Sequence, residues 1–231
     1  MNADQLKRKA AERAVELIED GMKLGLGTGS TARHVLEVIA EKRANGELQN
    51  IRGVPTSSAT RDQANQLGIP VTTLDDLPHL DLAIDGADEV DPDLNLVKGL
   101  GGALLWEKIV ESAADRLVIV VDESKLVDRL CEKAPLPVEV VQFAWSTHMH
   151  FLKQLGGSPS LRKNGMEPFV TDSGNYIIDC SFDDGIADPW LLQTEIRNRA
   201  GIVESGLFLD MAEQVIVASA TGVRTLLRSD A

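Results

Sequence analysis

Short apolar runs alternate with helical patterns through the first half of this 231-residue chain, and this alternation constrains the fold more than any other feature. The apolar runs lie in MKLGLG, NIRGVP and LDLAIDG, and the helical patterns fill STARHVLEVIAEKRANG and SSATRDQANQLG between them. A strand, an amphipathic helix and another strand in succession are typical of βαβ units on a parallel sheet. A further helix, ALLWEKIVESAAD, and a buried strand in RLVIVVDESK extend the pattern. We therefore expect a Rossmann-like domain through about residue 130.

The texture of the sequence changes at the prolines of APLPVEV. From there the pattern is strand, helix, three strands and helix, in the segments PVEVV, WSTHMHFLKQLG, SPSLR, PFVTD, NYIIDCSF and DPWLLQTEIRNRAG. This order resembles a ferredoxin-like module. The final segment, EQVIVASATGVRTLLRSD, predicts one more apolar strand and a short helix that return to the first sheet. The sequence thus predicts an α/β fold, with a Rossmann-like catalytic domain of residues 1–130 and 207–231 and a smaller α+β domain of residues 131–206.

Composition and charge exclude several classes of protein. Apolar residues make up 43% of the chain and charged residues 26%, close to the average for soluble proteins, and no stretch is apolar for long enough to span a bilayer. Charges interrupt the N-terminal segment MNADQLKRKAAERAVELIEDG throughout, so we read it as an amphipathic helix, not a signal peptide, and expect a cytoplasmic protein without a membrane partner. The net charge of −13 argues against a nucleic-acid partner, because binding a phosphate backbone needs a basic face.

Cysteines and histidines offer no metal-ligand pattern. Cys131 and Cys180 are far apart and lack CxxC or Cys/His spacing, so we expect two small buried thiols and neither a disulfide framework nor a zinc site. His148 and His150 are two residues apart in a predicted helix, where their side chains face different directions. The sequence therefore predicts no metal.

A glycine-rich loop, GLGTGSTARH, follows a predicted strand and opens a predicted helix. Backbone N–H groups and the helix dipole attract a phosphate to such a position, so we expect an anion cradle at Thr28, Gly29, Ser30 and Thr31. Gly27, Gly29 and Ala32 also match a loose dinucleotide pattern, but NIRGVPTSS lacks the acidic residue that NAD binding needs. The loop is not a P-loop either, because no Gly-Lys-Ser or Gly-Lys-Thr follows. A tight turn with a serine N-cap is the alternative.

The segment DGADEVDPDLNLVKGLGG places carboxylates close to a lysine among glycines. Asp85 and Asp88 end an apolar run, so we expect them at the carboxyl edge of a parallel strand, where ligands of open α/β sheets bind. Lys98 closes a second apolar run, and the glycines after it let the backbone approach a ligand closely. Glu107 borders the apolar stripe of the next helix, and a partly desolvated carboxylate suits a general base. Together these groups suit proton abstraction next to a carbonyl, with a lysine and backbone amides stabilising the enediolate oxygen.

Six separate stretches are specific enough to suggest a family. They are GLGTGSTA, GVPTS, IDGADEVD, KGLGGALLWEKIV, VDESK and ESGLF, in that order. Through them the chain resembles A-type ribose-5-phosphate isomerase over essentially its whole length. The resemblance implies an enzyme that interconverts ribose 5-phosphate and ribulose 5-phosphate without a metal or organic cofactor. The chain departs from the family at Leu100, where relatives commonly have Gly or Arg, and at Trp106, where they commonly have Arg.

The resemblance also implies roles for individual residues. Glu107 would be the base that moves a proton between C1 and C2, and Asp85 would also assist ring opening. The sugar and the enediolate would contact Asp85, Gly86, Ala87, Asp88, Lys98, Gly99, Leu100 and Gly101. The phosphate would be held by Thr28 to Thr31, Lys125 and Lys7. The family implies a homodimer or a dimer of dimers with contacts in the second domain, where core packing explains Trp190, Leu191 and Leu192 equally well.

Two functions from other classes remain open. A related α/β fold serves as the ligand-binding half of some transcription regulators, which sense a sugar phosphate and need no base. Against this sensor, no DNA-binding helix-turn-helix precedes the domain and Glu107 is present. The second alternative, an NAD-dependent dehydrogenase, is weakened by the missing acidic residue.

Overall fold

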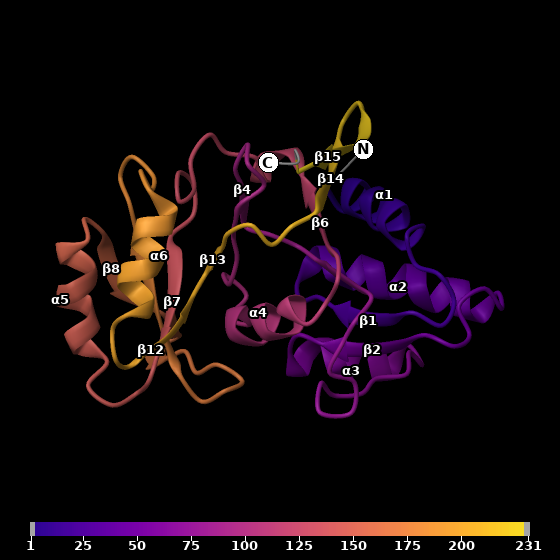
Figure 1. The fold of residues 1–231 in the computed structure, drawn as a ribbon, viewed down its shortest axis with the longest axis horizontal. Coiled ribbons are helices and arrows are strands. Elements are labelled where there is room, and N and C mark those ends of the chain that lie inside the picture. The colour runs from indigo at the N-terminus through magenta and orange to yellow at the C-terminus, as the bar shows by residue number, and fades with distance from the viewer. Residues whose placement is uncertain (1–2, 229–231) are drawn as a thin grey trace. The chain divides into compact units, whose positions relative to one another are not determined.

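The computed structural model describes residues 3–228, which form two compact units (Figure 1). Unit 1 comprises residues 3–87, 106–125 and 211–228, and unit 2 comprises residues 88–105 and 126–210. The chain therefore leaves unit 1 twice and returns to it twice. The domain bounds expected from the sequence stay a prediction; in the structure, residues 88–105 group with unit 2.

Unit 1 is built on a six-stranded sheet in the order β15-β14-β6-β3-β1-β2. All neighbouring strands are parallel except β14 and β15, which are antiparallel. Strands β1, β3 and β6 are almost wholly buried, as expected for parallel strands covered on both faces. The sheet confirms the Rossmann-like layout. Its strands are β1 (Lys23–Leu26), β2 (Arg52–Pro55), β3 (Leu82–Asp85), β6 (Leu117–Asp122), β14 (Gln214–Ser219) and β15 (Gly222–Leu227).

Helices cover both faces of this sheet. On one face, α1 (Ala3–Val15) packs against α2 (Ser30–Ala44), β6 and β14, and Leu24 and Leu26 of β1 belong to the same core. Gly25 lies between those leucines and so points to the opposite face. There it meets Val110 of α4 (Leu104–Ser112), whose Cγ1 would be 3.1 Å from a Cβ at Gly25. A further helix, α3 (Ser58–Gln66), packs against β2. No helix within residues 3–228 has the length and apolar character needed to cross a membrane.

Unit 2 contains the expected ferredoxin-like module. Its four-stranded sheet has the order β12-β7-β11-β8 with every neighbouring pair antiparallel. The helices pack on one face, where Leu152 and Ile196 share a core with Val138 of β7, and Glu139 therefore points to the other face. The elements are β7 (Leu136–Val140), α5 (Ser146–Gln154), β8 (Ser158–Leu161), β11 (Tyr176–Ser181), α6 (Pro189–Arg197) and β12 (Ile202–Ser205).

A small antiparallel sheet of unit 2 leads into residues 98–102, the Lys98 loop. It has the order β13-β5-β4, from β13 (Leu207–Phe208), β5 (Leu96–Val97) and β4 (Glu89–Val90). Glu89 is fully buried in β4, and its carboxylate accepts the backbone N–H groups of Cys131, Lys133 and Ala134. One of the acidic residues of the DGADEVD segment is thus structural, because it fixes a loop from inside the unit.

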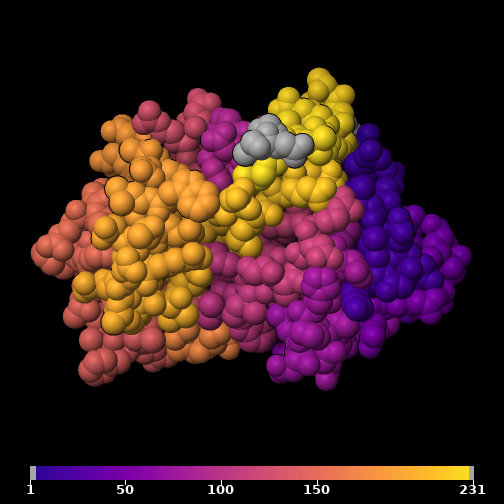
Figure 2. Space-filling model, viewed as in Figure 1, coloured from indigo at the N-terminus to yellow at the C-terminus, as the bar shows by residue number. Residues whose placement is uncertain are grey.

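Two elements differ from the sequence predictions. The short helix expected after β14 is wrong, because residues 222–227 form β15 and pair with β14 through a tight turn in which Ser219 opposes Gly222. The β-branched residues Val223 and Thr225 favour this strand, and β15 lies at the surface, in yellow in Figure 2. Residues 229–231 of the predicted segment lie outside the described residues. The strand expected in PFVTD is reduced to a hairpin of β9 (Lys163–Asn164) with β10 (Glu167–Pro168) and a single bridge at Val170.

Candidate active site

The glycine loop of residues 27–31 connects β1 to α2 at the carboxyl edge of the unit 1 sheet. Gly29 is the N-cap residue of α2, which runs from Ser30 to Ala44. Its φ of 104° is a left-handed conformation that favours glycine. The first N–H groups of a helix have no partner inside the helix, so this loop presents donors toward the sheet edge. The serine N-cap alternative is wrong, because Ser30 is the first helical residue and no side chain caps α2.

Hydroxyl groups hold this loop in place from the neighbouring strand end. Oγ1 of Thr28 lies 2.7 Å from Oγ1 of Thr56, 2.8 Å from Oγ of Ser57 and 3.0 Å from Oγ1 of Thr60. Thr60 also donates to the carbonyl of Gly27 at 2.9 Å. The side chain of Thr28 therefore points inward, and the loop offers its backbone to a ligand. These three residues, Thr56, Ser57 and Thr60, were not predicted as part of the site, although the GVPTS stretch contains two of them.

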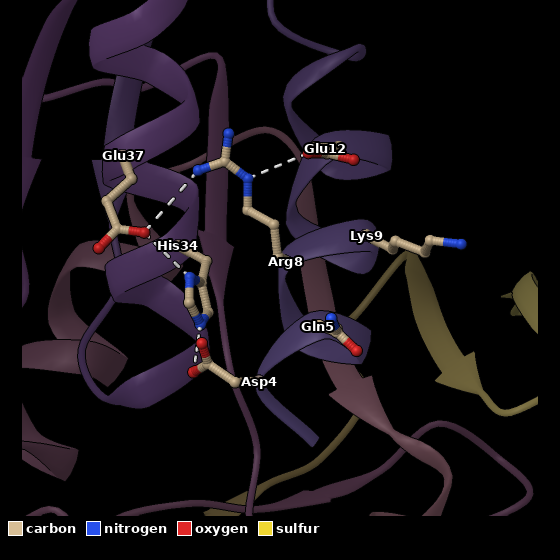
Figure 3. Close-up of a pocket in the computed structure, with 7 residues that line it drawn as sticks. All are labelled: Asp4, Gln5, Arg8, Lys9, Glu12, His34 and Glu37. Atoms are coloured by element: carbon tan, nitrogen blue, oxygen red, sulfur yellow. Dashed lines mark hydrogen bonds and ion pairs between the residues drawn. The ribbon is translucent and has the colours of Figure 1, made fainter. Parts of the chain in front are cut away.

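Lys7 reaches the same loop from α1, because its Nζ donates to Oγ of Ser30 at 2.8 Å. A network of ion pairs and hydrogen bonds between side chains of α1 and α2 fixes these two helices against each other (Figure 3). There His34 of α2 lies 3.0 Å from Oδ1 of Asp4 and 2.9 Å from Oε2 of Glu37, and Arg8 reaches Glu37 at 3.8 Å. The network orients the helix that carries Lys7. The structure thus brings the predicted lysine to the predicted anion cradle.

Asp85 ends β3 and lies beside this loop. Its Oδ1 accepts the backbone N–H of Thr28 at 2.9 Å and that of Gly86 at 2.6 Å, and its side chain is buried. A Cβ at Gly27 would lie 2.2 Å from the same Oδ1, so only glycine leaves room for the carboxylate. Ala87 follows Gly86 and closes unit 1 before the chain enters unit 2.

Glu107 lies in the first turn of α4 and is only 5% exposed. The sequence pattern placed it at the border of the apolar stripe, and the structure buries it more completely. Lys125 lies in a 3₁₀ turn (Glu123–Lys125) directly after β6, at the same sheet edge as Asp85. Within the described residues, no hydrogen bond or ion pair joins Lys125 to the loop of residues 27–31.

The Lys98 loop is ordered by its own unit. Lys98 is 1% exposed, its Nζ lies 5.4 Å from the centre of the Phe208 ring, and its N–H donates to the carbonyl of Gly206 at 2.9 Å. Oδ2 of Asp88 accepts the N–H of Leu100 at 2.9 Å. The structure thus connects Asp88 directly to the predicted substrate loop.

The loop around Leu100 is exposed, and its glycines are conformationally required. Gly99 has φ 106° and Gly102 has φ 85°, and the Leu100 side chain is 42% exposed. The carbonyls of Gly99 and Leu100 both accept hydrogen bonds from Arg162. Arg162 was not among the residues predicted for the site, and the only signal for it in the sequence is its position at the end of the SPSLR strand pattern.

The remaining candidates separate into core and surface. Leu192 is buried in the unit 2 core, whereas Trp190 and Leu191 are more than half exposed on α6. Cys131 and Cys180 are free and buried, and burial raises the pKa of Cys180 to about 12. His148 is buried, its Nδ1 lies 3.1 Å from Nε of Arg199, and burial lowers its pKa.

The sequence matches a known family along most of its length. The model for the family described as ribose 5-phosphate isomerase A (phosphoriboisomerase A) matches residues 52–222. Ribose-5-phosphate isomerase A of Roseiflexus sp. strain RS-1 is 51% identical over 224 residues, which cover 96% of both chains. The protein of the same name from Pyrococcus abyssi is 46% identical over 99% of this chain and 100% of its own.

Solved structures agree with the sequence matches. A D-ribose-5-phosphate isomerase in complex with phospho-erythronic acid has a TM-score of 0.96 at 43% identity, covering 99% of this chain and 100% of its own. The ribose 5-phosphate isomerase of Plasmodium falciparum has a TM-score of 0.95 at 38% identity, covering 98% and 100%.

Proposed function

The chain belongs to the ribose 5-phosphate isomerase A family, and from this premise we propose which of its residues carry out the reaction. The protein interconverts ribose 5-phosphate and ribulose 5-phosphate through an enediolate. In the open-chain aldose, a base removes the proton from C2 and the C1 oxygen takes up negative charge. Return of this proton to C1, together with movement of the C2 hydroxyl proton to the C1 oxygen, leaves the carbonyl at C2 and completes the ketose. The reaction thus needs one base and a set of donors for a developing oxyanion.

Glu107 is the base in this proposal. A carboxylate moves a proton most effectively when its pKa is close to the working pH and when water is excluded from it. The burial of Glu107 in the first turn of α4 supports this role. Lys98, Asp88 and the backbone of Gly99, Leu100 and Gly101 contact the sugar and stabilise the enediolate. The hydrogen bond from Leu100 to Asp88 supports the assignment of both to one group of contacts.

The observation that carries the proposal is the hydrogen bond between Thr28 and Asp85. It joins an anion cradle at a helix N-terminus to a buried carboxylate at the end of the neighbouring strand. A five-carbon sugar phosphate has a phosphate at one end and hydroxyl groups next to it, so it matches this pair of groups. Asp85, with Gly86 and Ala87, contacts the sugar hydroxyls and assists ring opening. A solved relative is in complex with phospho-erythronic acid, a phosphorylated sugar acid, which supports the same ligand class here.

The phosphate is held by local positive potential in an acidic protein. The loop of Thr28 to Thr31 binds it through the backbone N–H groups of Gly29, Ser30 and Thr31, because the N–H of Thr28 is bonded to Asp85, and Lys7 and Lys125 supply charge. The bond from Lys7 to Ser30 supports this arrangement. With a net charge of −13, long-range attraction of the substrate is weak, so binding depends on these nearby groups.

We further propose that the enzyme works without a metal or organic cofactor in the cytoplasm, as a homodimer or a dimer of dimers. Trp190 and Leu191, two neighbouring large apolar side chains exposed on α6, support a contact between copies there. Sedimentation of the wild type and of a Trp190→Ser variant tests this assembly. An unchanged dimer in the variant would place the contact elsewhere.

Conversion of ribose 5-phosphate by the purified protein in excess EDTA tests the proposed chemistry. Turnover at the metal-replete rate is the expected result. Tight binding of ribose 5-phosphate without turnover would instead indicate a sugar-phosphate sensor, and activity that only a divalent cation restores would contradict metal-free catalysis.

A further inference from the structure

Arg162 lies at the end of β8 in unit 2 and binds the backbone of the Lys98 loop. Its Nη1 donates to the carbonyl of Gly99 at 2.8 Å and to that of Leu100 at 3.0 Å. Its other edge forms a two-point ion pair with Asp179, with Nε 2.9 Å from Oδ2 and Nη2 bonded to Oδ1. The Arg162 side chain is only 11% exposed. The guanidinium is therefore held in one orientation and holds two consecutive carbonyls.

These two bonds fix the direction of two N–H groups. In a trans peptide the C=O and the N–H point to opposite sides, and the described chain has no cis peptide. The carbonyl of Gly99 points to Arg162, so the N–H of Leu100 points away from Arg162. This N–H donates to Oδ2 of Asp88 at 2.9 Å. By the same rule the carbonyl of Leu100 turns the N–H of Gly101 away from Arg162. This N–H makes no hydrogen bond to the described part of the chain, and Gly101 is exposed.

Phe169 restrains the same loop and also contacts Arg162. The N–H of Phe169 donates to the carbonyl of Arg162 at 2.9 Å, and the guanidinium lies 5.8 Å from the centre of its ring. The ring occupies the space where a Cβ at Gly102 would lie, 2.4 Å from its nearest atom. Arg162 and Phe169 together leave residues 99–102 little freedom to rotate.

We propose that Arg162 is a positioning residue for catalysis, which turns the Gly101 N–H toward the substrate as a donor for the enediolate oxygen, while the Leu100 N–H is held by Asp88. It acts through the backbone and does not touch the substrate. Its charge also polarises both peptides, because hydrogen bonds in series strengthen one another. This inference rests on the proposed role of the Lys98 loop.

The planar guanidinium explains why arginine is needed at this position. A guanidinium presents five donors in a fixed plane, which allows it to bind Asp179 along one edge and two carbonyls with the remaining nitrogen. A lysine ammonium has three donors around a single point and no fixed plane. Arg162→Lys therefore keeps the charge but loses the geometry, and we expect it to behave like Arg162→Gln.

The test compares kinetics and binding in the Arg162→Gln and Arg162→Lys variants. Loss of one oxyanion donor costs about 10²- to 10³-fold in kcat, so we expect kcat to fall about 10- to 10³-fold with little change in KM. Binding is measured by calorimetry with two probes. Phospho-erythronic acid carries a carboxylate in place of the reacting carbonyl and should bind more weakly to the variants, whereas inorganic phosphate should bind as to the wild type.

Arg199→Gln is the matched control, because Arg199 also binds a carbonyl, that of Thr147 at 3.2 Å, and lies 4.4 Å from the ring centre of Phe151. Within residues 3–228, Arg199 makes no hydrogen bond or ion pair to the Lys98 loop, so Arg199→Gln should lower the Tm without lowering kcat. If Arg162→Gln fails to fold, Asp179→Asn is used in its place, because it weakens the ion pair that holds the Arg162 guanidinium. It should lower kcat by a smaller factor than expected for Arg162→Gln, again with little change in KM.

Three results would overturn the inference. They are an unchanged kcat in both folded Arg162 variants, recovery of kcat by Arg162→Lys, or an equal loss of affinity for both probes. Because wild-type turnover is measured in the same series, failure of the inference remains distinct from failure of the proposed isomerase.

Discussion

The backbone N–H of Thr28 donates to Oδ1 of Asp85 at 2.9 Å, so two segments 57 positions apart in the sequence meet at one edge of the unit 1 sheet. The parallel pairing of β1 with β3 places both strand ends at this edge. The contact explains why Gly27 precedes Thr28, since a side chain there would occupy the position of the carboxylate.

Gly27→Ala should therefore disturb the site through steric conflict alone. Gly27 does not have a positive φ, so the added methyl group creates no backbone strain, but it would lie 2.2 Å from Oδ1 of Asp85. Overpacking of this kind costs about 1–3 kcal/mol, and we expect kcat/KM to fall at least about tenfold. Gly86→Ala is the control, because the nearest atom to its added Cβ is 3.8 Å away. Equal unfolding free energies for the two variants would contradict this account.

Lys7→Ala should raise KM for the substrate more than it lowers kcat. Its Nζ is bonded to Ser30 at the anion cradle, and loss of one charge-assisted phosphate contact is worth about 1.5–3 kcal/mol, so KM should rise about tenfold or more. Lys9→Ala removes the same charge from the same helix, but Figure 3 shows Lys9 pointing away from α2. We expect an unchanged KM for that variant, and parallel KM increases in both would point to long-range charge instead of a contact.

Glu139 should make the stability of the protein depend on pH. Burial raises its pKa, and the nearby Glu204 and Asp172 raise it further, although Thr171 and Asn175 donate to its Oε1. As pH rises, the Glu139 carboxyl therefore loses its proton at a lower pH in the unfolded chain than in the folded protein. The stability that Glu139 contributes is fully present below about pH 4.3 and is lost as pH rises through the raised pKa of the folded state.

Glu139→Gln removes this titration and keeps an oxygen for both donors. The difference in Tm between the variant and the wild type should therefore increase in favour of the variant as pH rises from about 4.3 toward neutrality. Differential scanning calorimetry across this range measures it, with Glu195→Gln on the exposed side of α6 as the control. A Tm difference that is constant with pH would show that Glu139 is not the group responsible.

Much of the fold follows from local patterns in the sequence. The alternation of apolar runs with helical patterns predicts the parallel strands β1, β2, β3 and β6, and the order of elements after APLPVEV predicts the ferredoxin-like sheet. The β15 hairpin was missed because GVRTLL has no helical stripe or strand alternation strong enough to decide between them. Pairing with β14, which is a tertiary contact, makes residues 222–227 a strand.

The proposed site could be derived from the sequence where its residues lie in single segments, and not where it depends on contacts between distant segments. Asp85, Lys98 and the residues of the glycine loop follow from strand ends and glycines. The role of Arg162 depends on the register of β8 against β11, which brings it beside Asp179, and on a loop some 60 residues earlier. The hydroxyl contacts of Thr28 likewise depend on the parallel register of β1 with β2.

In the proposed mechanism, Glu107 moves the proton between C2 and C1. Ribose 5-phosphate incubated in D₂O with the wild type should lose its C2 proton to solvent or yield ribulose 5-phosphate, as followed by proton NMR. The Glu107→Gln variant should do both at least about 10²- to 10⁴-fold more slowly, while its affinity for phospho-erythronic acid stays within a few fold of the wild-type value. Exchange by the variant at the wild-type rate would contradict the assignment of Glu107 as the base.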